Sequence, residues 1–257
     1  MNSLKQNVFN KLPEITLLFW IMKICATTLG ETAGDLFSMT LNIGYALSSI
    51  VLVGIFLVTL ITQLKARKFH PLLYWTVILS TSTAGTTMSD FMDRTLHFGY
   101  AKGSLVLITG LITTLVIWYL TEKSLSVNNV KTPRAELFYW IAILFSNTLG
   151  TAFGDFLADN SGLGFLGGAT LVSGVLLVIV LLHYYTKVSS IVLFWLAFVL
   201  TRPFGATFGD LLTKVPAKGG LGFGTIGSSV VLVTILGILI IYSIKKHTEP
   251  KKLLILD

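Results

Sequence analysis

The stretch that decides the fold is residues 19–35, which read FWIMKICATTLGETAGD. An aromatic residue precedes Trp, Asp follows fifteen residues after that Trp, and Gly lies five residues before the Asp. The same pattern returns at 74–90, 139–155 and 194–210. A pattern that recurs at such intervals, with a second apolar stretch after each copy, is typical of repeated two-helix units. The sequence therefore predicts one domain over 1–257 with four repeats, at 14–64, 71–121, 135–186 and 188–244.

The composition is that of a membrane protein. Hydrophobic residues make up 53% of the 257 residues and charged residues only 12%, and the mean hydropathy is +0.80. Soluble domains carry about 25% charged residues. Each repeat contains two apolar stretches long enough to cross about 30 Å of hydrocarbon as helices. We predict an all-α integral membrane protein whose eight transmembrane helices lie near 14–36, 44–64, 71–92, 100–121, 135–157, 164–186, 188–211 and 222–244.

The basic residues indicate an orientation. Thirteen of the nineteen Lys and Arg residues lie on the side of the two termini, four lie on the other side, and two fall inside expected helices. Basic residues concentrate on the cytoplasmic side of membrane proteins, so both termini are expected in the cytoplasm. A basic face beside anionic lipid accounts for the net charge of +7, and we expect the lipid bilayer, not nucleic acid, as its partner.

Each repeat is expected to be a helical hairpin, and all four hairpins enter the membrane in the same direction because each crosses it twice. This is a parallel repeat, so the four Asp-bearing helices can surround a common axis with the plainer helices outside. Small residues four apart allow such helices to approach closely. The pairs are Gly30 and Gly34, Gly85 and Ser89, Gly150 and Gly154, and Gly205 and Gly209.

The repeated carboxylates are the candidate functional groups, namely Asp35, Asp90, Asp155 and Asp210. Ionisable residues within membrane helices are costly and usually mark ion or proton pathways. Only the first repeat adds a second acid, Glu31, on the same helix face one turn before Asp35. Carboxylate and hydroxyl oxygens suit hard cations. Each Asp falls near the outer end of its helix, so an interfacial, hydrated Asp is the structural alternative.

Two cations, Lys23 and Arg202, are expected inside the bundle. Lys23 lies two turns before Glu31 on the same face, with Thr27 between them, and Arg202 lies eight residues before Asp210. Each needs a carboxylate or a wet cavity, so we interpret them as internal counter-ions. Supporting polar residues are Thr27, Thr28 and Asn147. Because the repeats differ at these positions, they predict an asymmetric site in a pseudo-symmetric scaffold.

Several functions lack their sequence signals. The four His residues lie at loops or helix ends without metal-ligand spacing, and the lone Cys25 forms no soft-metal cluster. No phosphate-binding glycine loop is present, which argues against ATP-driven activity. We expect no enzyme activity and no cofactor other than a transported ion.

The segment Thr28-Leu29-Gly30-Glu31-Thr32-Ala33-Gly34-Asp35 and its three relatives resemble a bacterial family of predicted membrane-anchored proteins. That family contains up to four copies of a two-helix repeat of unknown function, and the likeness covers roughly residues 14 to 245. The resemblance implies a bacterial inner-membrane protein of eight helices. Glu31 to Asp35 is also similar to the Glu-x-Gly-Asp signature of manganese and calcium exchangers. Here the spacing is one residue longer, and Leu36 replaces that family's basic residue.

The leading functional hypothesis is a secondary transporter that exports a divalent cation such as manganese against protons. The five carboxylates would supply oxygen ligands. One alternative is a channel or transporter for a small anionic or organic solute bound by Lys23 and Arg202. The other is a non-transporting scaffold in which Asp–Arg pairs serve assembly. Acids that converge on one wet cavity favour transport, and one-to-one pairing with Arg or Lys favours a scaffold. The sequence leaves a homo-oligomer open.

Overall fold

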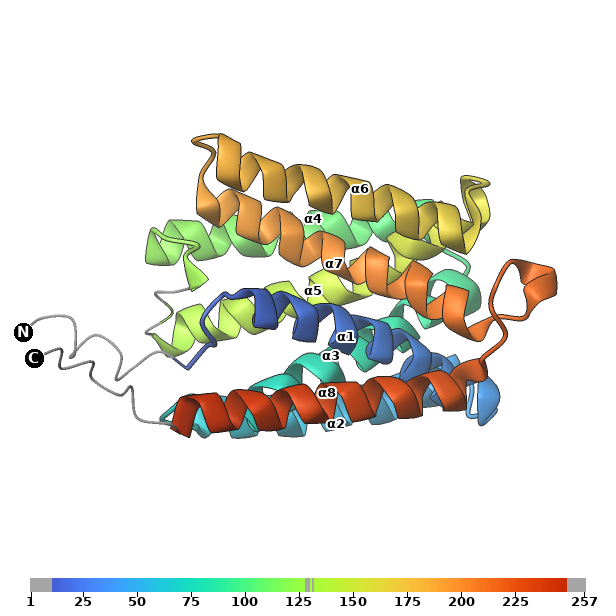
Figure 1. Ribbon diagram of the computed structural model, residues 1–257, viewed down its shortest axis with the longest axis horizontal. Helices are drawn as coiled ribbons and strands as arrows, with labels where there is room; N and C mark the ends of the chain where they lie inside the picture. The colour runs from blue at the N-terminus through green and yellow to red at the C-terminus, as the bar shows by residue number, and fades with distance from the viewer. Residues whose placement is uncertain (1–10, 128–129, 131, 249–257) are drawn as a thin grey trace, which may run out of the picture.

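The computed structural model describes residues 11–127, 130 and 132–248, and this part of the chain is helical without a β-strand (Figure 1). The eight helices expected from the sequence are present. They are α1 (Leu17–Asp35), α2 (Tyr45–Lys65), α3 (Pro71–Asp90), α4 (Tyr100–Glu122), α5 (Pro133–Asp155), α6 (Gly164–Tyr185), α7 (Ser190–Thr213) and α8 (Gly224–Thr248).

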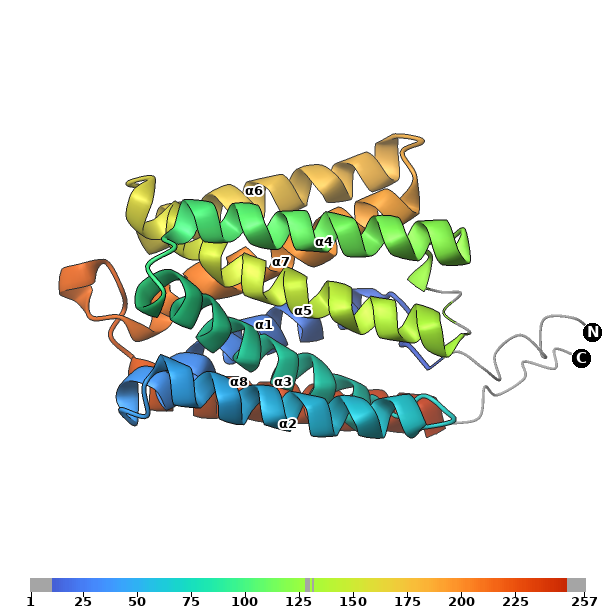
Figure 2. The same cartoon turned by 180° about the vertical axis from the view of Figure 1, so that it is seen from behind.

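The four Asp-bearing helices α1, α3, α5 and α7, the inner helices, form a closed ring. α1 packs on α3, α3 on α5, α5 on α7, and α7 returns to α1. All four run in the same direction (Figures 1 and 2). The even-numbered outer helices cover this ring and are far more exposed. Buried residues form 72% of the apolar part of α5 and 56% of that of α7, against 22–28% in α2, α4, α6 and α8.

The hairpin expectation needs a correction, because each outer helix packs mainly on the inner helix of the following repeat. α2 lies along α3, α4 along α5 and α6 along α7, while α8, the last outer helix, lies along α1 of the first repeat. Connection length accounts for this exchange at α2–α3 and α6–α7, but not at α4–α5, where the connection of ten residues, 123–132, is longer than the nine residues, 91–99, between α3 and α4. Five residues, 66–70, join α2 to α3, whereas nine residues, 36–44, join α1 to α2. Short connections place consecutive helices side by side and antiparallel.

Close packing of the inner helices depends on the repeated glycines. The first glycine of each motif receives the side chain found eight residues before the Asp of the adjacent repeat. A Cβ at Gly205 would lie 2.7 Å from Thr27 Oγ1, a distance that real Cβ atoms essentially never show. The corresponding pairs are Gly30 with Ser82, Gly85 with Asn147, Gly150 with Arg202 and Gly205 with Thr27. Gly34, Gly154 and Gly209 likewise face Thr86, Ala206 and Glu31.

One end of the ring, which we call the aromatic end, is filled by the repeated aromatic pairs. The first aromatic ring of each pair contacts the Trp of the next repeat, with centroids 5.6–6.3 Å apart. The contacts are Phe19–Trp75, Tyr74–Trp140, Tyr139–Trp195 and Phe194–Trp20. The hydroxyls of Tyr74 and Tyr139 also lie 2.6 Å apart. Aromatic side chains therefore close the bundle at the end where α1 begins.

The opposite end, which we call the acid end, holds the four repeated Asp residues. In the first three repeats the inner helix continues beyond its Asp as a π-helical turn: η2 (Leu36–Thr40), η3 (Phe91–Thr95) and η5 (Phe156–Asn160). The outer helices then start near glycines in the left-handed region, with φ of +81° at Gly44 and +72° at Gly99. Side chains with a Cβ rarely adopt this conformation, which explains the repeated turn glycine.

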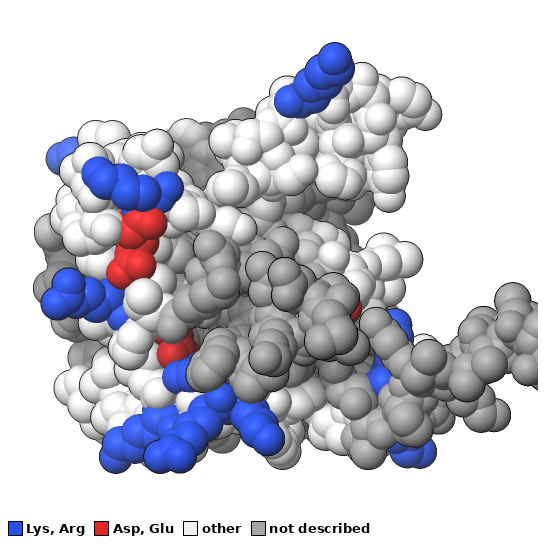
Figure 3. Space-filling model, turned by 90° about the vertical axis from the view of Figure 1, so that its left-hand side faces the viewer, with Lys and Arg blue, Asp and Glu red and all other residues white. Residues whose placement is uncertain are grey.

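Six of the helices are long and apolar enough to cross a membrane: α2, α4, α5, α6, α7 and α8. α1 and α3 fall outside this group because their buried faces carry Lys23, Glu31 and many hydroxyls. Exposed Lys and Arg side chains gather at the rim of the aromatic end (Figure 3). They include Lys65, Arg67, Lys68, Lys123, Arg134, Lys187, Lys245 and Lys246.

Candidate functional site

Polar side chains form layers across the ring between the aromatic end and the acid end. The residue eight positions before each repeated Asp is fully buried. These residues are Thr27, Ser82, Asn147 and Arg202. One turn closer to the acid end lie Glu31, Thr86, Thr151 and Ala206, which are 0–3% exposed. Each layer takes one residue from each inner helix. The repeats therefore bring unlike groups to equivalent places in the ring.

Arg202 occupies the middle of the ring and ties the inner helices together. Its guanidinium forms an ion pair with Glu31 on α1, with Nη1 3.0 Å from Oε2. It also donates hydrogen bonds to the hydroxyls of Thr86 on α3, at 2.5 Å, and Thr151 on α5, at 2.8 Å. Further bonds reach the carbonyl oxygens of Ser82 and Thr27. One side chain from α7 thus contacts all three other inner helices and fills the axis at this level.

The two threonines complete the environment of Glu31. The hydroxyl of Thr151 donates to Glu31 Oε2 at 3.1 Å, and that of Thr86 lies 3.3 Å from the same oxygen. The carboxylate therefore receives donors from three helices, as a buried charge requires. Thr27 and Thr28 bond instead to carbonyl oxygens about one turn back in α1, although Thr27 also donates across to the carbonyl of Thr201.

Lys23, which was expected to need a carboxylate or a wet cavity, lies apart from the acids. It is 0% exposed, and its Nζ has no hydrogen-bond partner among the described residues. The ammonium lies 3.9 Å from the ring centroid of Phe198, a cation–π geometry. Arg202, not Lys23, is the partner of Glu31. Asn147 is similarly buried, and neither atom of its amide has a hydrogen-bond partner within the described part of the chain.

The four repeated Asp residues form an acid ring at the outer ends of the inner helices, and each is only 2–4% exposed. Two cations bridge them in pairs. Lys214 Nζ lies 2.5 Å from Asp35 and 3.1 Å from Asp210. Arg94 lies 2.8 Å from Asp90 and 3.1 Å from Asp155. The arrangement is two acids for each cation, so it matches neither one wet cavity nor one-to-one pairing.

Lys214 follows the last residue of α7 and covers its half of the acid ring. Burial alone would lower the pKa of its ammonium, but the carboxylates of Asp210 and Asp35 outweigh this effect and hold the pKa above the usual value. Its side chain is 21% exposed, against 34% for Arg94. Both cations therefore lie between the acid ring and the surrounding solvent.

Arg94 and Lys214 are the site residues that the sequence analysis missed. Both were placed in outer loops, yet each comes four residues after the Asp of its own repeat. This spacing brings side chains together on a helix and could have indicated both pairs. The first and third repeats have Met39 and Asp159 at this position. Their Asp residues consequently share the cation of a neighbouring repeat.

One part of the acid ring has the spacing of a cation site. Glu31, Asp35 and Asp210 each offer one carboxylate oxygen, and these three oxygens lie within 4.8 Å of one another. Oxygen ligands bind hard divalent cations at about 2.0–2.6 Å, so two ligands of one ion are up to about 4–5 Å apart. The cluster joins α1 to α7 and includes both acids that Lys214 bridges.

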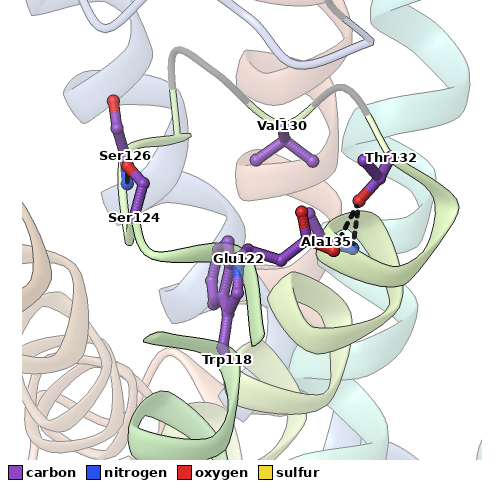
Figure 4. Close-up of a pocket in the computed structure, with 7 residues that line it drawn as sticks. All are labelled: Trp118, Glu122, Ser124, Ser126, Val130, Thr132 and Ala135. Atoms are coloured by element: carbon purple, nitrogen blue, oxygen red, sulfur yellow. Dashed lines mark hydrogen bonds between the residues drawn. The ribbon is translucent and has the colours of Figure 1, made fainter. Parts of the chain in front are cut away.

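Two hollows lie away from these acids. A pocket of about 220 Å³ at the connection from α4 to α5 is lined by Trp118, Glu122, Ser124, Ser126, Val130, Thr132 and Ala135 (Figure 4). Thr132 spans its rim by donating to Glu122 at 2.9 Å. A larger apolar groove of about 510 Å³ lies along α1, α6 and α7 near the aromatic end. Neither hollow is lined by a residue of the acid ring.

The fold and site define a class: an all-helical repeat protein, compatible with a membrane protein, whose ring of inner helices encloses paired charges. The family model described as Repeat of Unknown Function (DUF347) matches residues 18–69, 73–124, 138–189 and 193–248. Because these matches cover most of the sequence, the chain belongs to this family. Comparison with curated proteins and with solved structures gave no match.

Proposed function

We propose that this protein is a secondary transporter of the bacterial inner membrane that exchanges a divalent cation, such as manganese, for protons. The observation that carries the proposal is the charge of the acid ring. Among the residues that the structure describes, the four buried Asp residues share only Lys214 and Arg94, while Arg202 balances Glu31. With every Asp ionised, the ring has two negative charges without a partner. Buried charges require compensation, which one divalent cation or two protons would supply.

The cation would bind between Glu31, Asp35 and Asp210. The ammonium of Lys214 now bridges two of these acids, so it acts as a tethered substitute for the substrate. Lys214 lies in the segment after α7 and can move outward without disturbing the inner helices. The guanidinium of Arg94 keeps its charge and binds through several nitrogens. In the other half of the acid ring, the bridge from Arg94 to Asp90 and Asp155 would therefore stay in place during transport.

All eight helices would cross the membrane, with the aromatic end in the cytoplasm and the acid end outside. The exposed basic side chains at the aromatic end support this orientation. Polar α1 and α3 can span the membrane because neighbouring helices shield their charged faces. Arg202 blocks the axis, which favours a transporter with alternating access over an open channel. The bonds that Arg202 makes to the inner helices also leave its guanidinium few free donors for an anionic solute.

A non-transporting scaffold is the second candidate, and the bridges from Lys214 and Arg94 favour it, since they join neighbouring repeats. A scaffold needs the ion pairs but no exchange of ions. Flux measurements distinguish the two functions.

The first test is cation-dependent proton flux in proteoliposomes. We expect Mn²⁺ to drive proton movement in the wild type, and Glu31→Gln and Asp35→Asn each to abolish it. Asp90→Asn and Asp155→Asn should reduce flux partially, because these residues lie outside the three-carboxylate cluster. Each variant must reach the membrane, and its thermal stability is measured alongside, because Glu31→Gln leaves Arg202 buried without its acid. Asp35→Asn leaves that pair intact and is therefore the decisive variant. Wild-type flux in both Glu31→Gln and Asp35→Asn would contradict the proposed cation site and leave the scaffold as the remaining candidate function.

The role of Lys214 predicts a gain in binding. In Lys214→Met the competing ammonium is gone, so Mn²⁺ affinity of the purified protein should rise about tenfold, or ~1.4 kcal/mol. Arg94→Met is the matched control, since it removes the equivalent cation from the other half of the ring, and its affinity should change much less. Calorimetric titration measures both. Unchanged or weaker binding in Lys214→Met would contradict the substitution of metal for ammonium.

A further inference from the structure

The segment that precedes α1 crosses the aromatic end of the ring. Residues 11–16 lead from the far side of the bundle to the start of α1, where Thr16 caps the helix by accepting a hydrogen bond from the amide of Phe19. The dark blue segment lies beside the start of α5 in both views (Figures 1 and 2). α5 is the inner helix diagonally opposite α1, so this segment spans the mouth of the ring.

Lys11 anchors the far end of this strap, which we define as residues 11–16. Its Nζ lies 2.8 Å from Glu136 Oε2 in the first turn of α5 and donates to the carbonyl oxygen of Leu64, in the last turn of α2, at 3.0 Å. Gln63 approaches the other Glu136 oxygen at 3.5 Å. Glu136 and Gln63 are 3% and 1% exposed, and Leu12 of the strap is also buried.

These contacts connect elements that do not neighbour each other in the ring. Six extended residues reach about 20 Å, which is enough to cross two helices spaced about 8–10 Å apart. The strap therefore links the start of α1 to α5 and α2 at the end that the aromatic rings close. The Lys11 side chain is 22% exposed, so water can reach this ion pair, and ion pairs in contact with water are weak enough to open.

We propose that the strap is a gate of the aromatic end, latched by Lys11 and Glu136, and that it must release before the aromatic rings can part. This inference rests on the proposed transport function, because only alternating access requires this end to open. In the structure both ends are covered, the acid end by Lys214 and Arg94 and the aromatic end by the strap and the aromatic rings, and alternating access would open the two ends in turn. Release of Lys11 would free α1 to move away from α5.

The test measures access to the ring from the aromatic end, independently of transport. A single cysteine replaces Asn147 in a Cys25→Ala background, and a small charged thiol reagent is added on that side of oriented vesicles. Lys11→Glu places two carboxylates together, so labelling should accelerate at least about fivefold. The exchange Lys11→Glu with Glu136→Lys should restore the slow rate. Lys68→Glu, an equal charge change at an exposed residue of the same end, should leave the rate unchanged.

Equal labelling rates in Lys11→Glu and the parent would overturn the gate, whatever the flux result. Faster labelling that the charge exchange does not reverse would also overturn it, because the latch would then not be the ion pair. Flux in the same variants separates the two proposals. Flux and Mn²⁺ binding of the wild-type protein test the cation proposal, whereas the labelling rates alone test the gate. Thermal stability of each variant identifies any rate change caused by unfolding.

Discussion

Replacing Arg202 by Met should strongly destabilise the protein, by about 3–5 kcal/mol, because Glu31 would remain buried without its cation. The guanidinium is 0% exposed and contacts α1, α3 and α5 at once. Met fills part of the volume but replaces none of these bonds. Thermal unfolding in detergent should show a large fall in the transition temperature.

The double variant Arg202→Met with Glu31→Gln separates charge from packing. It removes both partners, so no charge is left unpaired, and it should recover much of the lost stability. Arg202→Lys should recover little, because a single ammonium cannot reach the acceptors on three helices. If the double variant were as unstable as Arg202→Met, the loss would come from packing and not from the ion pair.

Replacing Gly150 by Leu should also disrupt the ring. Any Cβ at this position would overlap the side chain of Arg202, both at Cβ and at Cγ. α5 and α7 would have to separate, which breaks the layer in which Arg202 meets Thr151. We expect loss of the monodisperse protein on size exclusion, or a clearly lower unfolding temperature.

Leu177→Ile in α6 is the control for this substitution, because Leu177 is 59% exposed on an outer helix. Lipid or detergent accepts either side chain, and stability should stay close to that of the wild type. If Gly150→Leu were equally stable, the inner helices would tolerate separation and the close approach at the glycines would be incidental.

The repeat in the sequence was sufficient to predict the helices and the separation into inner and outer sets. The Trp-to-Asp spacing located the inner helices, and the Gly spacing predicted their close contacts, as at Gly85 and Gly205. Hydropathy could not show that α2 packs on α3, because an apolar face indicates burial or lipid contact but not the partner. Hydropathy likewise could not show that α8 of the last repeat packs on α1 of the first, because this contact forms only when the number of repeats closes the ring.

The site was predicted in part. The acids and Arg202 stood out because charges are rare in apolar helices. Arg94 and Lys214 did not, since the expected helices ended at 92 and 211 and left both cations in loops. In the structure η3 and α7 continue to Thr95 and Thr213, and this extra turn returns the cations toward the acid ring. Helical spacing placed Lys23 and Glu31 on one face of α1, but it could not show that Arg202 from α7 is the cation that pairs with Glu31.

The contact between α1 and α8 has a consequence for biogenesis. α1 carries Lys23 and Glu31 and is made first, yet two of the helices that enclose it, α7 and α8, are made last. In the proposed membrane arrangement, this polar helix has no complete shield from lipid during synthesis until the final repeat has been inserted. The unfinished chain must therefore keep its first helix in a protected or reversible position, and a chain truncated before α8 would expose α1 along one whole side.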